Sequence, residues 1–479
     1  MFRRPAAVGL IAILVLACAV RIGILLAFPS VFNYDTTGAI HGNDAYDTYA
    51  KNLNMTGVFG MIPGQPDAHL TSILYTYVLA GLYRFFGSGY RQVATLHILL
   101  DLIAIVALYQ ICRLLLPRGQ WIGLLAAAFY ALYPYLIFQN LTLIDTPLFM
   151  ALLYLFIWAV IVLRDQPTRL FLGLTGVLLG ALLYTRPVIA LFIPFVALWW
   201  LFSWGVKQTV LRALVMVVIA SLLLLPWIVR NYTVYQAFIP IAANSGENLW
   251  WGNNKYTIPF LEAGYHPSWA HPDESLAGLD MRAQDARLTQ LAFEYLGQHP
   301  GTIPELWLRK FAAYWTIEIF PTRNPSGEIR TTEYNGSVTI VQDTQGGVTV
   351  NGVPVNDPVT TYSQPLFDQL GRWVQRIYFG GLFALSLIGL YLTRRQWRTV
   401  SILWFVQISN TIVYVLLVPA TRYRVPTDPL LFIFSAYALF AFGEYWKNRS
   451  QRKRTPQAAI EPGQPLVSQE PKNAGGAAL

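Results

Sequence analysis

Long apolar runs alternate with short polar connections along most of the chain, up to about residue 446. An α-helix needs about 20 predominantly apolar residues to cross roughly 30 Å of hydrocarbon. The pattern therefore predicts an all-α polytopic membrane protein with about ten transmembrane helices. The predicted spans lie near residues 6–28, 91–115, 120–138, 146–163, 170–185, 187–204, 210–229, 374–393, 398–418 and 429–446.

One further apolar stretch, residues 70–86, has the pattern of an amphipathic helix. If it crossed the membrane, every later loop would change sides, and the basic loops at 113–118 and 164–169 would face outward. We therefore predict that it lies in the outer membrane interface, with a short eleventh span as the alternative. Its apolar stripe consists of Leu70, Ile73, Leu74, Tyr77, Val78, Gly81, Leu82 and Phe85, whereas Thr71, Ser72, Tyr75, Thr76, Tyr83 and Arg84 lie largely off the stripe.

Composition and charge strengthen the membrane prediction, since 55% of the residues are hydrophobic and only 12% are charged. Lys and Arg gather in alternate short loops, which marks those loops as cytoplasmic. We therefore predict a multi-pass protein of the plasma (inner) membrane with both termini in the cytoplasm. These loops and attraction to anionic membrane lipid account for most of the net charge of +9, so it requires no nucleic-acid partner. A cleaved signal peptide is the alternative to a signal anchor for the first run.

The spacing of the runs predicts four parts. Residues 1–229 form a membrane module with a first outer loop at 29–90, and residues 230–373 form an extracytoplasmic domain. Three further spans occupy 374–446, and 447–479 is a basic, then disordered, cytoplasmic tail. The outer domain is predicted to be α+β, because 282–318 has a helical pattern and Asn351-Gly352 marks a hairpin turn.

The chemically informative residues fall on the predicted outer face, beginning with carboxylates. Asp44 and Asp47 are three residues apart, so in a helix they share one side, together with Tyr46. Asp145 lies in another outer loop, at the start of a helix. An acid in such a position can instead cap the helix N-terminus, and this alternative stays open. The acids together predict a site that binds or orients a polar substrate.

Cations accompany these acids on the same face. Arginine forms bidentate hydrogen bonds with phosphate oxygens, and lysine provides a point charge for them. The sequence therefore predicts an anionic lipid head group as a ligand, although any single arginine can instead snorkel toward ordinary lipid. The candidates are Arg186, Arg230 and Arg424, each close to a Pro at a helix end, with Arg422 and Lys310.

These residues stand in an order that resembles a known family over about residues 10–430. The chain is similar to the GT-C membrane glycosyltransferases, in the branch with protein O-mannosyltransferases and lipid A aminoarabinose transferases. The matching pieces are Asn43-Asp44-Ala-Tyr46-Asp-Thr-Tyr-Ala50-Lys-Asn52-Leu53 with Gly57, Leu132-Tyr133-Pro134 leading to Asp145, Tyr184-Thr-Arg186-Pro187, Leu225-Pro226-Trp227-Ile-Val-Arg230-Asn231-Tyr232, Asn244-Ser-Gly246-Glu-Asn248-Leu-Trp-Trp-Gly252-Asn253, and Arg422-Tyr-Arg424-Val-Pro426.

The resemblance implies a GT-C fold of seven helices, with interfacial helices after the first, and a polyprenyl-phosphate sugar as donor. Asp44 falls on the position of the first-loop catalytic carboxylate, and Asp145 falls on that of the second-loop acid. The His-Pro-Pro or Lys-Pro-Pro signature of the two named groups is replaced by Gln65-Pro66-Asp67-Ala68-His69. The acceptor therefore stays open among a protein, a glycolipid and a polysaccharide.

The predicted reaction is an inverting sugar transfer in which Asp44 takes a proton from the acceptor hydroxyl. Arg186, Arg230 or Arg424 would hold the charge of the leaving phosphate. Asp47, Tyr46, Arg422, Lys310 and His69 are the further candidates for substrate binding. The sequence establishes no cofactor, and a divalent metal bound by Asp44 and Asp47 with His41 or His69 stays open.

A polar-lipid transporter or flippase is the alternative from another functional class. Transporters usually keep ionisable groups near the middle of the bilayer. Here the predicted spans carry almost no charge apart from Arg21 and Asp101, and the other charges lie at the rim. The sequence therefore favours the transferase.

Overall fold

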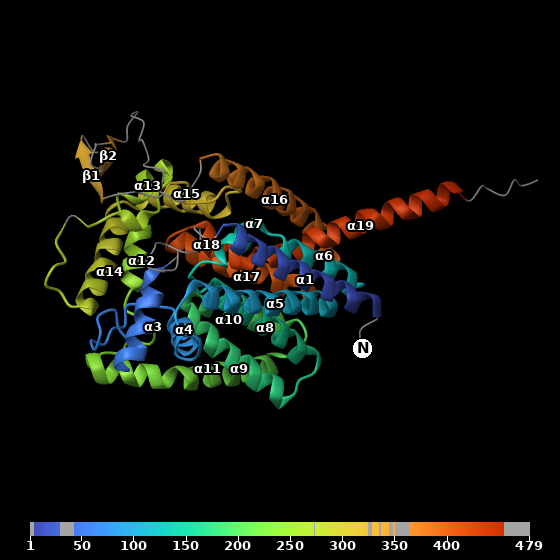
Figure 1. The fold of residues 1–479 in the computed structure, drawn as a ribbon, viewed down its shortest axis with the longest axis horizontal. Coiled ribbons are helices and arrows are strands. Elements are labelled where there is room, and N and C mark those ends of the chain that lie inside the picture. The colour runs from blue at the N-terminus through green and yellow to red at the C-terminus, as the bar shows by residue number, and fades with distance from the viewer. Residues whose placement is uncertain are drawn as a thin grey trace, which may run out of the picture. The chain divides into compact units, whose positions relative to one another are not determined.

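The computed structural model describes residues 4–28, 43–272, 274–323, 328–334, 337–343, 348–349 and 365–454. Helices make up most of these residues, as Figure 1 shows. The chain divides into two compact units, residues 1–438 and 439–479, and the second is described only up to residue 454. All features of the site belong to the first unit.

Each of the ten predicted apolar runs forms helix in the structure. Seven helices of the described residues are long and apolar enough to cross a membrane. Three other runs form shorter apolar helices, α6 (Gly119–Ala131), α9 (Arg169–Thr185) and α10 (Phe192–Leu201). The seven are α1 (Arg4–Ala27), α5 (Tyr90–Leu115), α8 (Thr146–Asp165), α11 (Val206–Tyr235), α16 (Pro365–Leu392), α17 (Trp397–Leu416) and α19 (Asp428–Arg454).

Prolines explain two of the differences from the predicted helix ends. The run at 120–138 is two helices, α6 and α7 (Pro134–Gln139), because the residue before a proline avoids helical torsion angles and Tyr133 is extended at ψ 110°. The prediction of a single span there was wrong. The run that begins at Pro187 opens with a 3-10 helix, Pro187–Leu191. By contrast, α11 passes through Pro226 and continues to Tyr235, beyond the predicted end at residue 229.

Two helices follow the first span and carry the outer-loop motif. Helix α3 (Asp44–Thr56) begins after Asn43, whose side chain caps it by accepting a hydrogen bond from the Ala45 N–H at 3.1 Å. It ends at Gly57, whose φ of 73° is the left-handed conformation that glycine adopts readily. Helix α4 (Ile73–Phe86) packs against α3, as Figure 1 also shows.

The two faces of α4 explain its placement. The side packed into the protein carries Tyr75, Thr76 and Tyr83, which are buried. The predicted apolar stripe is exposed in part, since Phe85 is 79% and Tyr77 is 46% exposed, whereas Ile73 is buried and the stripe leucines and Val78 pack partly against the core. With 14 residues the helix is shorter than a span requires. Both observations favour the interfacial helix over the eleventh span.

A buried ion pair joins the first helix to the helix bundle. Arg21 of α1 donates from Nε to Oδ2 of Asp101 of α5 at 2.7 Å, and both side chains are almost fully buried. Asp101 Oδ1 also accepts from the Tyr130 hydroxyl at 2.8 Å and from Asn140 Nδ2 at 2.7 Å. The two charges singled out inside the predicted spans therefore pair with each other, which offsets part of the cost of burying them.

The segment after α11 forms helices and a small sheet that group together in Figure 1. The predicted helical stretch at 282–318 is α14 (Met281–Gln298) and α15 (Ile303–Trp315), separated by a 3-10 turn at Pro300–Thr302. The antiparallel sheet has the order β1 (Glu328–Tyr334), β2 (Ser337–Asp343), β3 (Val348–Thr349). The predicted hairpin turn at Asn351-Gly352 lies outside the described residues. Shorter helices here are α12 (Ser245–Gly252), α13 (Thr257–Ala263) and, before α19, α18 (Thr421–Arg424).

Candidate functional site

The best-defined charged pair of the site joins Asp145 to Arg186. Arg186 donates from Nε to Asp145 Oδ2 at 2.8 Å and from Nη2 to Oδ1 at 2.6 Å, a bidentate geometry. Ser72 adds its hydroxyl to Oδ2 at 2.9 Å. Both carboxylate oxygens of Asp145 are therefore occupied. Asp145 precedes α8, but its side chain makes no capping hydrogen bond, so the alternative of a simple helix cap fails.

The environment keeps Asp145 ionised. Burial alone would raise the pKa of this carboxyl, but the Arg186 guanidinium, its hydrogen bonds and the Ser72 hydroxyl outweigh burial. The net effect is a pKa below the ordinary value for aspartate. Asp145 is therefore an anion whose charge is already matched by Arg186.

Contacts with α5 and with the residue before α3 hold the segment before Asp145 in place. The Asn140 carbonyl lies 2.8 Å from Nδ1 of His97, and the other ring nitrogen of His97 lies 2.8 Å from the Tyr75 hydroxyl. The Asn43 N–H donates to the Leu143 carbonyl at 3.0 Å. This last bond places the first turn of α3, which begins at Asp44, beside the segment that carries Asp145. The Asp44 side chain itself lies outside what the structure describes.

Tyr46 extends the same site from the first turn of α3. Its ring is 7% exposed and meets the Tyr75 ring edge-on, with 5.1 Å between centroids. Burial, and then the Asp145 charge, raise the pKa of Tyr46 well above its ordinary value, so the hydroxyl stays protonated. The positive charges of Arg186 and Arg422 act on the pKa of the same phenol in the opposite direction.

Arg422 of α18 is the most available cation of the site. It is exposed, its Nη2 donates to the hydroxyl of Tyr423 at 2.7 Å, and its guanidinium lies over the Tyr423 ring. Its charge lowers the pKa of Asp145, after the larger effects of burial, Arg186 and Ser72. The Tyr423 ring stacks on that of Tyr414 with 4.5 Å between centroids. We call Tyr46, Ser72, Asp145, Arg186, Tyr414 and Arg422 the carboxylate–arginine cluster.

Arg424, two residues further on, points into the protein. It is fully buried and pairs through Nε with Oδ1 of Asp428 at 3.1 Å. Its Nη1 donates to the carbonyls of Tyr314 at 3.0 Å and Thr316 at 2.5 Å, and its guanidinium lies over the Phe379 ring. Arg424 therefore ties α18 and α19 to α15 and α16, and we leave it out of the cluster.

Lys310 is also an internal connection. Its Nζ is buried and lies near four oxygen acceptors, including the carbonyl of Gly252 at 2.9 Å and that of Leu416 at 3.2 Å. Burial lowers the pKa of Lys310 to about 7. Gly252 is required here because a Cβ would collide with the Leu417 carbonyl. Lys310 therefore joins the end of α12 to the end of α17.

The sequence also marked Arg230 as a phosphate ligand, but its guanidinium holds backbone instead. Nη1 donates to the Asp67 carbonyl at 2.9 Å and Nη2 to the Phe59 carbonyl at 3.1 Å. The guanidinium also lies over the Trp227 ring. Arg230 thus fixes the loop between α3 and α4 to α11.

Asp47 and His69 lie at the edges of the α3–α4 region. Asp47 accepts from Lys51 at 2.6 Å and from the Tyr83 hydroxyl at 2.8 Å. His69 lies 3.4 Å from the Glu247 carboxylate and is about half exposed. The structure therefore does not bring either residue to Asp145.

Metal binding has no support from the described part of the chain, where no group of three or more His, Cys, Asp or Glu side chains could hold an ion. His41 and the Asp44 side chain, two of the predicted ligands, fall outside that part. We derive no step through a metal.

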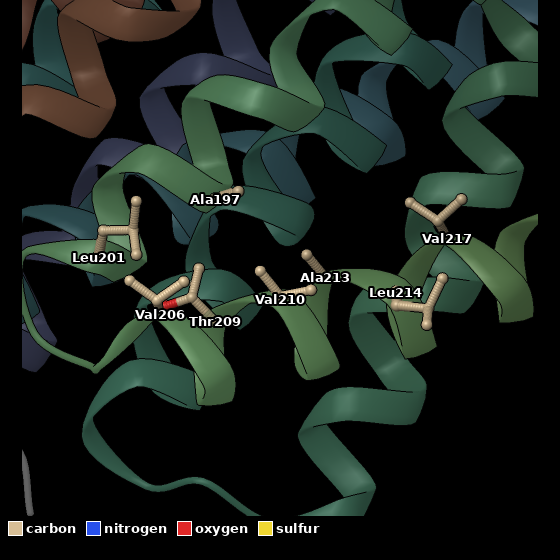
Figure 2. A pocket seen from close by; sticks show the side chains of 8 residues that line it. All are labelled: Ala197, Leu201, Val206, Thr209, Val210, Ala213, Leu214 and Val217. Carbon is tan, nitrogen blue, oxygen red and sulfur yellow. The ribbon is translucent and has the colours of Figure 1, made fainter.

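An apolar hollow lies elsewhere, between α10 and α11. Figure 2 shows its lining, and its volume is about 360 Å³. Only the Thr209 hydroxyl is polar among the lining side chains, so the hollow has no charge with which to bind a phosphate. It is lined by Ala197, Leu201, Val206, Thr209, Val210, Ala213, Leu214 and Val217.

Comparisons with known proteins agree with this fold. Residues 70–229 match the family model of dolichyl-phosphate-mannose-protein mannosyltransferases. The oligosaccharyltransferase of Archaeoglobus fulgidus, solved in complex with Zn and sulfate, superimposes with a TM-score of 0.50 at 15% identity, over 95% of this chain and 52% of that one. The ArnT structure of Cupriavidus metallidurans, bound to undecaprenyl phosphate, gives a TM-score of 0.37 at 15% identity, over 92% of this chain and 81% of that one. No curated protein matches.

These findings define the class of protein. The chain is an integral multi-pass membrane protein with the fold of the GT-C enzymes, and it spans about half the length of the oligosaccharyltransferase that it matches. The predicted resemblance to the GT-C glycosyltransferases, and to the mannosyltransferase branch in particular, is confirmed over residues 70–229. That segment contains Ser72, Asp145 and Arg186 of the cluster.

Sequence reasoning missed two members of the cluster, Ser72 and Tyr414. Ser72 stands directly before an apolar helix and Tyr414 lies within an apolar run, so neither has a local signal in the sequence. Both became visible only through contacts with residues far along the chain.

Proposed function

We propose that the protein is a glycosyltransferase that moves a sugar from a polyprenyl-phosphate donor to an acceptor hydroxyl, with inversion, on the extracytoplasmic face. Both termini would then lie in the cytoplasm, and residues 230–373 would form an outer α+β domain. One observation supports this proposal above the others. The start of α3 at Asp44 and the Asp145–Arg186 pair come from distant parts of the chain and meet through the Asn43–Leu143 hydrogen bond, and the charge of Arg422 acts on the pKa of Asp145.

In the proposed reaction Asp44 is the general base. It takes the proton from the acceptor hydroxyl as that oxygen attacks the anomeric carbon, and the bond from this carbon to the phosphate oxygen breaks on the opposite face. The bonding electron pair leaves with the polyprenyl phosphate. A phosphate is a good leaving group, so the site must mainly stabilise negative charge.

Asp145 would be a positioning residue in this scheme. Both of its oxygens are occupied by Arg186 and Ser72, and its lowered pKa makes it a poor proton acceptor. Its task would be to hold the Arg186 guanidinium at a fixed place and orientation, as preorganised charge stabilisation requires.

Arg186 and Arg422 are the proposed phosphate ligands. The Nη1 atom of Arg186 is buried and has no hydrogen-bond partner among the described residues, so one donor of the guanidinium is left for a ligand. Arg422 is accessible and lies near the same tyrosine and aspartate. Arg230 and Arg424 are used by backbone carbonyls and, for Arg424, by Asp428.

The acceptor class stays open among a protein, a glycolipid and a polysaccharide. A divalent metal stays an alternative only through residues that the structure does not describe, such as His41.

The testing experiment measures release of polyprenyl phosphate from a panel of polyprenyl-phosphate sugars by purified protein in detergent. Wild type should release the lipid phosphate from at least one donor, and Asp44→Asn should abolish release without lowering the melting temperature. Asp165→Asn is the matched control, because Asp165 is an exposed carboxylate at the far end of α8. Full activity of Asp44→Asn would remove Asp44 from the role of base. Binding of lipid phosphate without release from any donor would instead favour the transporter.

A further inference from the structure

His266 is a buried histidine whose ring is fixed by its own turn. It begins the sequence His266-Pro-Ser-Trp269 and has extended torsion angles, φ −75° and ψ 132°, as a residue before proline prefers. Its Nδ1 accepts from the Ser268 N–H at 3.2 Å and lies 2.6 Å from the Ser268 hydroxyl. The Trp269 N–H donates to the His266 carbonyl at 3.2 Å. The turn therefore determines where the imidazole points.

The same contacts determine which nitrogen carries the proton. A backbone N–H can only donate, so Nδ1 of His266 must be the acceptor. In the neutral ring the proton is then on Nε2. The His266 side chain is 94% buried by residue exposure, and Nε2 has no hydrogen-bond partner among the described residues. Buried donors are nearly always paired, so an unpaired one suggests a ligand.

The surroundings of His266 connect it to the carboxylate–arginine cluster. Its ring meets that of Tyr423 with 6.4 Å between centroids, and the Tyr423 hydroxyl accepts from Arg422. Burial, followed by the positive charge of Arg422, lowers the pKa of His266 to about 3. At neutral pH the ring is therefore an uncharged donor beside a fixed positive charge.

We propose that His266 Nε2–H donates a hydrogen bond to a phosphate oxygen of the polyprenyl-phosphate donor, next to Arg422. A ligand atom at this place must accept a hydrogen bond and is favoured if it is negative, and a phosphate oxygen meets both conditions. His266 would supply directional binding while Arg422 supplies charge. The inference rests on the proposed function. It adds His266, from the segment after α13, to the residues proposed to bind the phosphate.

The test compares two lipids that differ only in the phosphate. Binding of undecaprenyl phosphate and of uncharged undecaprenol is measured on the purified full-length protein in detergent. The variants are His266→Ala and His266→Gln, and the matched control is His271→Ala, because His271 is exposed and only five residues further along the same loop. Melting temperatures of all variants show whether each one is folded.

His266→Ala should weaken binding of undecaprenyl phosphate roughly 10-fold or more, the usual effect of losing a hydrogen bond to a charged group. Undecaprenol binding should not change. His266→Gln should recover part of the affinity, since its amide also donates, and it keeps the test valid if the alanine variant fails to fold. His271→Ala should bind both lipids like wild type.

Three results would overturn the assignment. Unchanged binding of undecaprenyl phosphate by a folded His266→Ala would show that Nε2 does not contact the phosphate. Equal losses for both lipids would show a structural role instead. If wild type bound no polyprenyl phosphate at all, the proposed function would fail together with this inference, whereas the first two results leave the proposed function intact.

Discussion

Replacing Asp145 by Asn separates two roles that a second acid in the site can have. As a positioning residue, Asp145 matters because its charge and its two oxygens hold Arg186. As a proton acceptor, it would matter because it titrates. Asparagine keeps the shape and one oxygen acceptor, but it removes the charge and places an amide donor against a guanidinium donor. The Ser72 hydroxyl can still bind to the remaining oxygen.

The expected loss follows from the geometry of the pair. Two unit charges about 4 Å apart interact by roughly 4 kcal/mol at an effective dielectric constant near 20. Removing one partner of a buried ion pair costs about 3–5 kcal/mol in measured cases. If that loss is felt in the transition state, at about 1.36 kcal/mol per factor of ten, turnover falls by roughly 10² to 10⁴. Arg186→Lys should cause a smaller loss, because it keeps the charge and loses the bidentate fork.

The assay is release of polyprenyl phosphate as a function of pH, with Asp165→Asn as control. The pKa of Asp145 is lowered, so the residue stays ionised above about pH 5 and contributes no limb to the activity profile. Asp145→Asn should therefore scale the whole profile down without changing its shape. Its contribution to stability is complete above the ordinary carboxyl pKa and is lost as the pH falls through the lowered folded value. A variant with near wild-type turnover, or one that loses the acid limb of the profile, would refute the positioning role.

Three further predictions concern residues that the structure places outside or at the rim of the site. Asp101→Asn leaves the Arg21 charge unpaired in the bundle and should cost about 3–5 kcal/mol of stability. A double variant that also carries Arg21→Met should melt at a higher temperature than Asp101→Asn alone. Equal melting temperatures of the two variants would contradict this prediction. Burial lowers the pKa of Lys310 to about 7, so above that pH the unfolded chain binds more protons than the folded one. Wild type should therefore gain stability relative to Lys310→Met between about pH 7 and 10, and a constant difference in melting temperature would contradict it. Arg422→Gln should lower turnover and keep the melting temperature, whereas Arg424→Gln should lower the melting temperature; the reverse pattern would exchange their roles.

The sequence predicted the helices well because the bilayer core favours long runs of apolar residues, and hydropathy detects such runs directly. All ten apolar runs are helical. Residues 70–86 were predicted to lie in the membrane interface, and the helix there has only 14 residues. The errors lie at the prolines. Pro134 breaks a helix and Pro226 does not, and composition alone cannot distinguish these cases because neighbouring helices decide whether the freed carbonyl is satisfied.

The site was predicted less completely, because one-dimensional spacing does not say which way a side chain points. Arg422 and Arg424 stand in one short helix, where two residues correspond to about 200° of rotation. They therefore face opposite directions, one toward the cluster and one toward Asp428. The sequence had favoured Arg424 because of the following proline. Only contacts with α15 and α16 show that its Nη1 is bound by backbone carbonyls and that its guanidinium lies over the Phe379 ring.

The same reasoning explains why α4 is informative for this fold. In a soluble protein the apolar face of a helix turns inward, but α4 exposes Tyr77 and Phe85 and buries Tyr75 and Tyr83. An apolar face is stable where lipid covers it, so the polar and aromatic face is free to build a site. Tyr75 contacts His97 and Tyr46, and Tyr83 contacts Asp47. The exposed end of the apolar stripe of α4 therefore suits a lipid surface, and two residues off the stripe, Tyr75 and Tyr83, contact the residues around the proposed chemistry.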